Sequence, residues 1–239
     1  MKKWFALGLS VIAALLLLLL PNPPQQQYYH NQGNIFGTYY NIRYKATKDL
    51  HQEIKEQLKQ FDYSLSPFNK ESVISKINRN ESTITDSLFE QMYYEAHAIS
   101  TLSHGAFDIT VAPLVNAWGF GTKSQGPRPK NQDINLDSIK AFVGYEKIQL
   151  NNHRIEKNDE RITLDASAIA KGFACDVIAN FLRQNGCTNL LVDIGGEVVL
   201  QGENDKGNAW RVGITRPTID ATGMEKELQE VIESHDLCM

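Results

Sequence analysis

The sequence is 239 residues long with 42% hydrophobic and 22% charged residues, a make-up that excludes wholesale disorder and suits one large or two small domains. Its net charge is −4 and it has no long basic run, which disfavours binding to the phosphate backbone of nucleic acids. Its three cysteines have no C-x-x-C spacing and no paired histidines nearby, so nothing signals a disulfide framework or a zinc site.

The chain begins with two lysines and an apolar run over residues 4–20, followed by a stretch rich in Pro and Gln. A charged start before such a run is typical of an export signal. The run is long for a signal-peptide core and no small-residue cleavage site follows it, so we expect residues 1–27 to be an uncleaved anchor and tether. Residues 28–239 would then lie on the periplasmic side of a bacterial inner membrane. A cleaved secretory signal is the alternative.

Hydrophobic periodicity predicts the elements of the first half. Apolar and polar side chains alternate over residues 34–46, which indicates a half-buried strand. A helix is expected after Asp49 as its N-cap, and another after Asp86, ending at Gly105. Four residues of the second helix are expected to face the core: Leu88, Met92, Ala96 and Ile99.

The second half predicts a hairpin over residues 148–155 and a strand over 162–165 that leads directly into a helix ending at Gly186. Another strand is expected over residues 190–194. Strand, helix and strand in this order favour a parallel pair, and thus a mixed sheet in an α+β fold.

Further elements complete the predicted organisation. A second hairpin is expected to join residues 198–200 to 210–214, and a helix is expected over 224–235. Residues 122–132, rich in polar residues, Gly and Pro, predict a surface loop.

Two segments carry residues suited to ligand binding. Asp108 lies on a glycine-containing turn, where it could bond a ribose or a base edge, although an Asx turn is the commoner role. At the start of the helix after Asp165, free N–H groups and Lys171 one turn later favour a phosphate site. Ordinary capping by Asp165 or Ser167 explains the same residues equally well. Gly195 and Gly196 indicate a tight turn, and close passage of a ligand is the alternative.

In this order, the segments resemble the ApbE family, the FAD:protein FMN transferases, formerly called thiamine biosynthesis lipoproteins. The resemblance lies in six blocks: residues 36–38, 65–68 with 72–78, 105–121, 165–176, 192–196 and 210–217. It implies a T-fold-like α+β architecture and a periplasmic enzyme that binds FAD and Mg²⁺. Such an enzyme attaches FMN through a phosphoester to a threonine or serine of a partner flavoprotein. Typical acceptors are subunits of ion-translocating respiratory complexes.

The resemblance also implies the site residues. Contacts with FAD are expected at seven positions: Phe36, Phe68, Ala106, Phe107, Asp108, Asp165 and Lys171. The family more often has methionine at the first of these positions and often tyrosine at the second, and phenylalanine keeps both apolar. The backbone carbonyl of Ala168 is expected to bind Mg²⁺. No catalytic residue is assigned, but three of these residues, Asp108, Asp165 and Lys171, should converge around the dinucleotide.

Family members normally continue for about a third more chain, beyond the length seen here. The resemblance places a histidine-bearing segment and the remaining Mg²⁺ ligands in that part. We therefore expect residues 28–239 to form an incomplete domain, and this chain alone to lack transfer activity. Two alternatives remain open, namely FAD pyrophosphatase activity with water as the acceptor, and non-catalytic flavin binding by a membrane-anchored protein.

Overall fold

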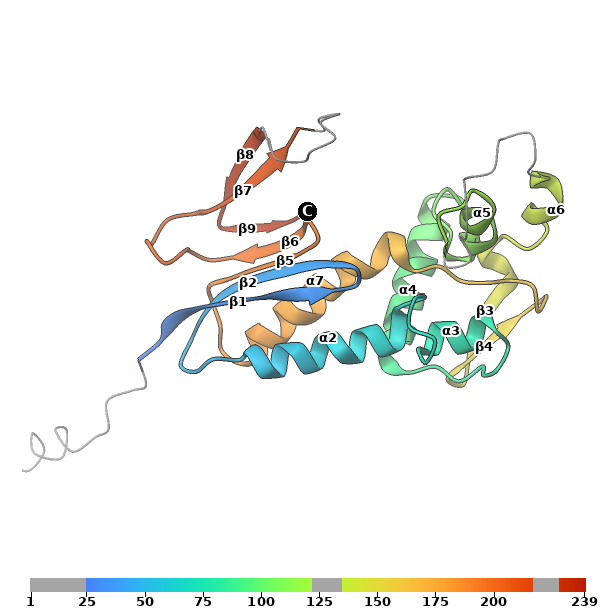
Figure 1. The fold of residues 1–239 in the computed structure, drawn as a ribbon, viewed down its shortest axis with the longest axis horizontal. Helices are drawn as coiled ribbons and strands as arrows, with labels where there is room; N and C mark the ends of the chain where they lie inside the picture. Colours follow the sequence, from blue (N-terminus) through green and yellow to red (C-terminus); the bar gives the residue numbers. More distant parts are fainter. Residues whose placement is uncertain (1–24, 122–134, 217–227) are drawn as a thin grey trace, which may run out of the picture.

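The computed structural model describes residues 25–121, 135–216 and 228–239. These residues form a sheet backed by two long helices, and beside it a mostly helical part (Figure 1). Within the described residues no helix is both long and apolar enough to span a membrane. Residues 1–24 of the expected anchor and the expected loop at 122–132 lie outside the described ranges, so both stay predictions.

The main sheet has five strands in the order β1-β2-β5-β6-β9, and neighbours in it pair antiparallel. Its strands are β1 (Gln27–Ile35), β2 (Thr38–Ala46), β5 (Leu190–Ile194), β6 (Glu197–Gln201) and β9 (Asp236–Cys238). The single strand predicted over residues 34–46 is wrong, because a turn at Phe36 and Gly37 divides it. Both turn residues have positive φ, 53° and 73°, as a tight two-residue hairpin requires.

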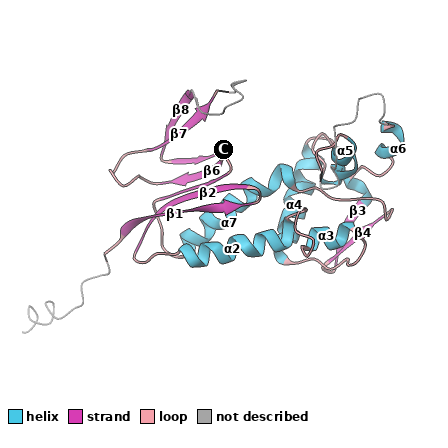
Figure 2. Cartoon of the chain, in the orientation of Figure 1, coloured by secondary structure: helices cyan, strands magenta, loops and turns pink. Residues whose placement is uncertain are grey.

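Two helices, α2 (His51–Leu65) and α7 (Ser167–Gln184), cover one face of this sheet (Figure 2). The alternation of strand side chains explains this packing, since Ile42, Tyr44 and Val192 all point to the helices and are fully buried. Helix α7 ends at Gln184 with Asn185 as its C-cap, two residues before the predicted end, and Gly186 follows with a left-handed φ of 78°. A small cluster around Trp210 packs on the opposite face of the sheet.

The second part contains short helices and one hairpin. Its elements are α3 (Val73–Asn78), α4 (Ser87–Leu102), η1 (Ile109–Val111), α5 (Ala112–Ala117), α6 (Leu136–Lys140), η3 (Tyr145–Lys147), β3 (Ile148–Asn151) and β4 (Arg154–Lys157). The structure confirms the β3–β4 hairpin and the capping of α4 by Asp86, whose Oδ1 accepts from Phe89 N at 2.8 Å. The predicted core face of α4 is partly wrong, because Ile99 is 39% exposed while Phe89 and Tyr93 are buried.

Three further predictions are corrected by the pairing of the strands. The expected parallel pair is wrong, since β5 is antiparallel to both β2 and β6. The expected hairpin between residues 198–200 and 210–214 does not form: β9 lies beside β6, while β7 (Trp210–Thr215) pairs with β8 (Leu228–Ser234). The described part of the helix predicted over 224–235 is therefore mainly strand β8.

The strand predicted over residues 162–165 is replaced by an extended segment outside any sheet. Its backbone groups bond to a side chain instead of a neighbouring strand. Asn78 Nδ2 donates to the Leu164 carbonyl at 2.8 Å, and Leu164 N donates to Asn78 Oδ1 at 2.7 Å. The segment thus reaches α7 in a fixed conformation.

Candidate functional site

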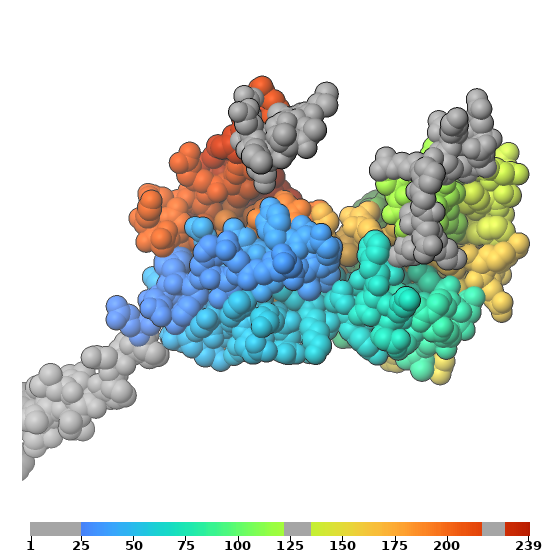
Figure 3. Space-filling model, viewed as in Figure 1, coloured from blue at the N-terminus to red at the C-terminus, as the bar shows by residue number. Residues whose placement is uncertain are grey.

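Two adjoining cavities open near the N-terminal end of α7. The larger, here called the apolar cavity, has a volume of about 630 Å³, and the smaller, the polar cavity, about 330 Å³. Both share Pro67, Phe68 and Ser167 in their walls. Volumes of this size are typical of sites for small molecules and cofactors. Figure 3 shows the surface hollowed between the blue β1–β2 hairpin and the teal region near α3, with gold α7 at the bottom.

Aromatic rings dominate the apolar cavity. Phe36, at the tip of the β1–β2 hairpin, packs on Phe61 with ring centroids 5.4 Å apart, and Phe61 packs on Phe173 at 5.5 Å. This chain of rings anchors Phe36 to the core. Phe68 is different, because it is 71% exposed and lies between the two cavities. An exposed ring between two cavities offers a flat apolar surface to a planar ligand.

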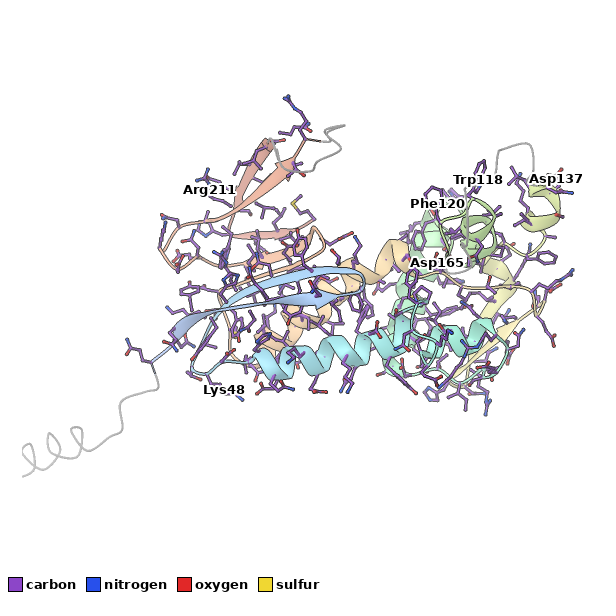
Figure 4. The ribbon with its side chains drawn as sticks, in the orientation of Figure 1. Lys48, Trp118, Phe120, Asp137, Asp165 and Arg211 are labelled. Atoms are coloured by element: carbon purple, nitrogen blue, oxygen red, sulfur yellow. The ribbon has the colours of Figure 1, made fainter. Side chains whose placement is uncertain are left out.

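Asp165 lies in the wall of the polar cavity at the entrance to α7. Its backbone N–H donates to the Ile109 carbonyl at 2.7 Å, and its Oδ1 accepts from Ser167 N at 2.8 Å. This bond from the residue two positions on is an Asx turn. Ala166 occupies the N-cap position of α7 without a side-chain bond, so the capping interpretation of Asp165 or Ser167 is wrong. Figure 4 shows Asp165 on the loop before α7, near Phe120, which lines the same cavity.

The first turn of α7 leaves polar groups facing outward. Ala168 is exposed there, and its N–H makes no hydrogen bond to a described residue. The N-terminus of an 18-residue helix also carries a partial positive charge. Lys171 follows in the wall of the apolar cavity, and its Nζ contacts both carboxylate oxygens of Glu197, at 2.6 and 2.7 Å.

Two more cations line the polar cavity, Lys70 and Arg79. Arg79 is engaged with Glu81, at 2.6 and 2.7 Å, and with the Lys70 carbonyl at 2.9 Å. The exposed Lys70 ammonium forms no ion pair with any residue that the structure describes. The polar cavity therefore offers positive charge to an anionic ligand.

Three predicted contacts line neither cavity: Ala106, Phe107 and Asp108. Phe107 is half-buried against the core, and Ala106 is exposed at the end of α4. The carboxylate of Asp108 already accepts three hydrogen bonds, from Thr110 N and Oγ1 at 2.7 Å and from Tyr145 N at 2.8 Å. Asp165 and Lys171 border adjoining cavities, whereas Asp108 connects to Asp165 only through the backbone of Ile109. A direct contact of Asp108 with FAD stays a prediction.

The described residues do not form a magnesium site. Within residues 25–121, 135–216 and 228–239, no three His, Cys, Asp or Glu side chains come together as a set of metal ligands. The carbonyl of Ala168 alone is too few ligands, because Mg²⁺ requires near-octahedral oxygen coordination. The two cavities instead combine aromatic side chains with cations, a lining suited to a planar, anionic ligand.

Sequence reasoning missed two residues of the site, Asn78 and Glu197. The hydrogen bonds of Asn78 reach Leu164, 86 residues away, and no local pattern signals such a contact. Glu197 directly follows the Gly195–Gly196 turn, which the structure confirms with φ of 60° and 98°. Only its position after that turn could have drawn attention to it.

Fold and cavities together define an α+β protein with a cofactor-sized cleft of mixed aromatic and cationic character. The sequence model of the ApbE family matches residues 36–238. The chain belongs to the ApbE family, and the α+β class and the resemblance expected from the sequence are confirmed.

Related proteins with established names support this assignment. An FAD:protein FMN transferase of Vibrio cholerae is 34% identical, covering 87% of this chain and 63% of the relative. The Escherichia coli K12 protein of the same name is 30% identical, covering 84% of this chain and 60% of its own length. This chain thus spans less than two thirds of the length of these relatives.

Solved structures show the same fold. The flavin transferase ApbE from Vibrio cholerae matches with a TM-score of 0.76 and 32% identity, over 89% of this chain and 70% of that one. The apo form of the Pseudomonas stutzeri flavinyl transferase ApbE matches with a TM-score of 0.71 and 28% identity, over 81% of this chain and 67% of that one.

Proposed function

We propose that the chain binds FAD for an FAD:protein FMN transferase reaction, in which FAD is cleaved and FMN becomes attached to a threonine or serine of a partner flavoprotein. The relatives named above carry this activity in their names. The observation that carries the proposal is the pair of adjoining cavities at the start of α7. One has aromatic walls suited to a flavin ring, and the other is lined by cations suited to phosphate.

The predicted site residues have different roles in this proposal. Phe36 and Phe68 contact the isoalloxazine ring, and the diphosphate lies where the two cavities adjoin. There it is bound by Lys171 and by the N–H of Ala168, which makes no hydrogen bond to a described residue, with the cations of the polar cavity alongside. Asp165 fixes the first turn of α7 through Ser167. Asp108 supports the same loop through its bonds to Thr110 and Tyr145, and it is not required to touch the ligand.

The chemical step is a phosphoryl transfer. The acceptor hydroxyl oxygen attacks the FMN phosphorus, the bond between that phosphorus and the bridging oxygen breaks, and AMP leaves with that oxygen. The hydroxyl loses its proton in the same reaction. The residues described here contribute binding and orientation, which is a large share of catalysis in such reactions.

Mg²⁺, the partner and the location are also part of the proposal. We propose that transfer requires Mg²⁺, that the acceptors are subunits of ion-translocating respiratory complexes, and that the reaction takes place on the periplasmic side of the inner membrane. The charged and apolar start of the sequence supports this location.

FAD binding tests the proposal directly. In a titration followed by flavin fluorescence, wild-type protein should bind FAD. Phe68→Ala should weaken binding about 5-fold or more, since stacking on an aromatic side chain contributes about 1–3 kcal/mol. Phe68→Tyr should retain affinity. The matched control is Leu102→Ala, because Leu102 is 82% exposed on α4 and lines neither cavity. Equal affinity of wild type and Phe68→Ala for FAD would show that Phe68 does not contribute to FAD binding.

A mass-spectrometric assay distinguishes the three candidate functions, namely FMN transfer, FAD pyrophosphatase activity and non-catalytic flavin binding. Wild-type protein is incubated with FAD, Mg²⁺ and an acceptor flavoprotein, with EDTA as the control. Transfer adds the mass of an FMN phosphoester to the acceptor, while pyrophosphatase activity releases free FMN and leaves the acceptor unmodified. FAD binding that is the same with and without Mg²⁺, with neither product, supports the non-catalytic alternative.

A further inference from the structure

Glu197 contacts Lys171 in the wall of the apolar cavity. Both of its carboxylate oxygens accept hydrogen bonds from the Lys171 ammonium, at 2.6 and 2.7 Å. Each side chain is 36% exposed, so the pair is open to water and to a ligand. An ammonium group has three N–H donors. Glu197 uses two of them, which leaves one for a group in the cavity.

The position of Glu197 is itself fixed. Cys175 lies one helical turn after Lys171 on α7, and its Sγ donates to the Glu197 carbonyl at 3.2 Å. Burial raises the pKa of the Cys175 thiol to about 12, so this donor keeps its proton. In the turn before Glu197, Asp193 Oδ1 accepts from Gly196 N at 3.0 Å. Helix α7 therefore holds Glu197 in two ways, because Lys171 bonds to its carboxylate and Cys175 bonds to its backbone carbonyl.

We propose that Glu197 is a positioning residue, which holds Lys171 at the cavity wall with its remaining N–H directed to an anionic diphosphate. This inference rests on the proposed binding of FAD. The lysine side chain is long and flexible, and fixing it before binding removes an entropic cost at the moment of binding.

Glu197 has a second effect of opposite sign. Its carboxylate cancels the charge of Lys171, so its removal adds net positive charge to the cavity and attracts an anion more strongly. Water and salt screen this attraction at an exposed site. We therefore expect the loss of positioning to outweigh the gain in positive charge, so that removal of Glu197 weakens binding of the anion. Weaker binding indicates that Glu197 positions Lys171, and tighter binding indicates that it acts as a counter-charge.

Four proteins test this in FAD titrations: wild type, Glu197→Gln, Lys171→Met and the double variant. Glu197→Gln should weaken binding about 3- to 10-fold, the range expected for one side chain that must be immobilised on binding. In the Lys171→Met background the same substitution should not weaken binding further, because it removes an unpaired carboxylate that faces the diphosphate. Glu203→Gln, which alters an exposed residue outside both cavities, is the charge-matched control and should have no effect.

Two results would overturn the proposal. Tighter binding by Glu197→Gln would make Glu197 a counter-charge only. Equal weakening in both backgrounds would show that Glu197 acts through the fold rather than through Lys171.

A second measurement does not depend on FAD. Lysines are acetylated with limiting reagent and their rates compared by peptide mass spectrometry, with the exposed Lys70 as internal reference. In wild type Lys171 should react more slowly than Lys70, and Glu197→Gln should accelerate Lys171 alone. Unchanged labelling of Lys171 would overturn the proposal. Should wild type fail to bind FAD, the proposed function fails, and the same four proteins titrated with inorganic pyrophosphate decide whether Lys171 faces an anion.

Discussion

Asp49, Asp108 and Asp165 are three aspartates at turns before helices, and each accepts a hydrogen bond from the backbone N–H two residues further on. Asp165 directly precedes Ala166, the N-cap of α7, and accepts from Ser167 N. Asp49 was expected to be the N-cap of α2, which is wrong, because Leu50 occupies that position. Its Oδ1 instead accepts from Tyr44 Oη at 2.9 Å, together with His51 N. The residue type and its place before a helix could be read from the sequence, whereas the further bonds of Asp49 to Tyr44 Oη and of Asp108 to Tyr145 N depend on the fold.

Asp108→Asn tests the structural interpretation of that residue. The amide group would turn a donor toward Tyr145 N or toward Thr110, where the carboxylate now accepts. We expect the free energy of unfolding in urea to fall by about 1–3 kcal/mol, the cost of leaving a partly buried donor unpaired. The control is Asp137→Asn, an exposed residue of α6 that should change stability little. Normal stability with lost FAD binding would instead support direct contact with FAD.

Helix α7 joins both cavities to the sheet. Gly172 lies inside it and Gly186 just after its end, and the effects of alanine at these two positions on stability can be compared. A Cβ atom added to Gly172 or to Gly186 would meet no other atom within 4 Å. The two positions differ in backbone conformation, because Gly186 has a φ of 78° and Gly172 lies inside the helix.

Alanine at these two positions should have opposite effects. Gly172→Ala should raise the free energy of unfolding by about 0.5–1 kcal/mol, since glycine is unfavourable inside a helix. Gly186→Ala should lower it by about 1–2 kcal/mol, because a left-handed conformation is strained for alanine. Urea unfolding measures both, and destabilisation by Gly172→Ala would show that the space beside it is needed by the fold.

Local elements with strong signals could be predicted from the sequence, and their pairing could not. The end of α7 just before Gly186 and the β3–β4 hairpin follow from capping and turn residues a few positions apart. The partner of β6 could not be predicted in this way. Strand β9, which begins more than 20 residues after the end of β7, pairs with β6, although β7 is nearer in the sequence. The same holds for the candidate site. Lys171 could be predicted from its position in the first turns of a helix, whereas its partner Glu197 could not, because their contact depends on the fold.

For the molecule as a whole, carboxylates set the response to acid. Five have lowered pKa values in the folded chain: Asp49, Glu53, Glu81, Glu90 and Asp159. Two, Asp176 and Asp193, have pKa values raised by burial. A lowered pKa stabilises the fold above the unfolded value and loses that contribution as the pH falls, while a raised pKa acts in reverse. The larger group predicts net loss of stability in acid.

Glu90 provides a specific test, because it connects α4 to two neighbouring segments. Hydrogen bonds from Thr85 and then His153 lower its pKa below the usual 4.5. The stability difference between wild type and Glu90→Gln should be complete at pH 7 and should shrink as the pH falls through 4.5 and below. Glu95→Gln, an exposed change on the same helix, is the control. A difference that stays constant between pH 7 and pH 3 would contradict this assignment.

The turn at the tip of the β1–β2 hairpin carries a conformational cost that no other part of the proposed site shares. Phe36 holds a left-handed backbone, with φ of 53°, in order to place its ring against Phe61. Asparagine or glycine would adopt this backbone more easily and would remove the ring. Because the same ring packs on Phe61, the left-handed backbone and the ring contact make opposite contributions to the stability of the hairpin tip.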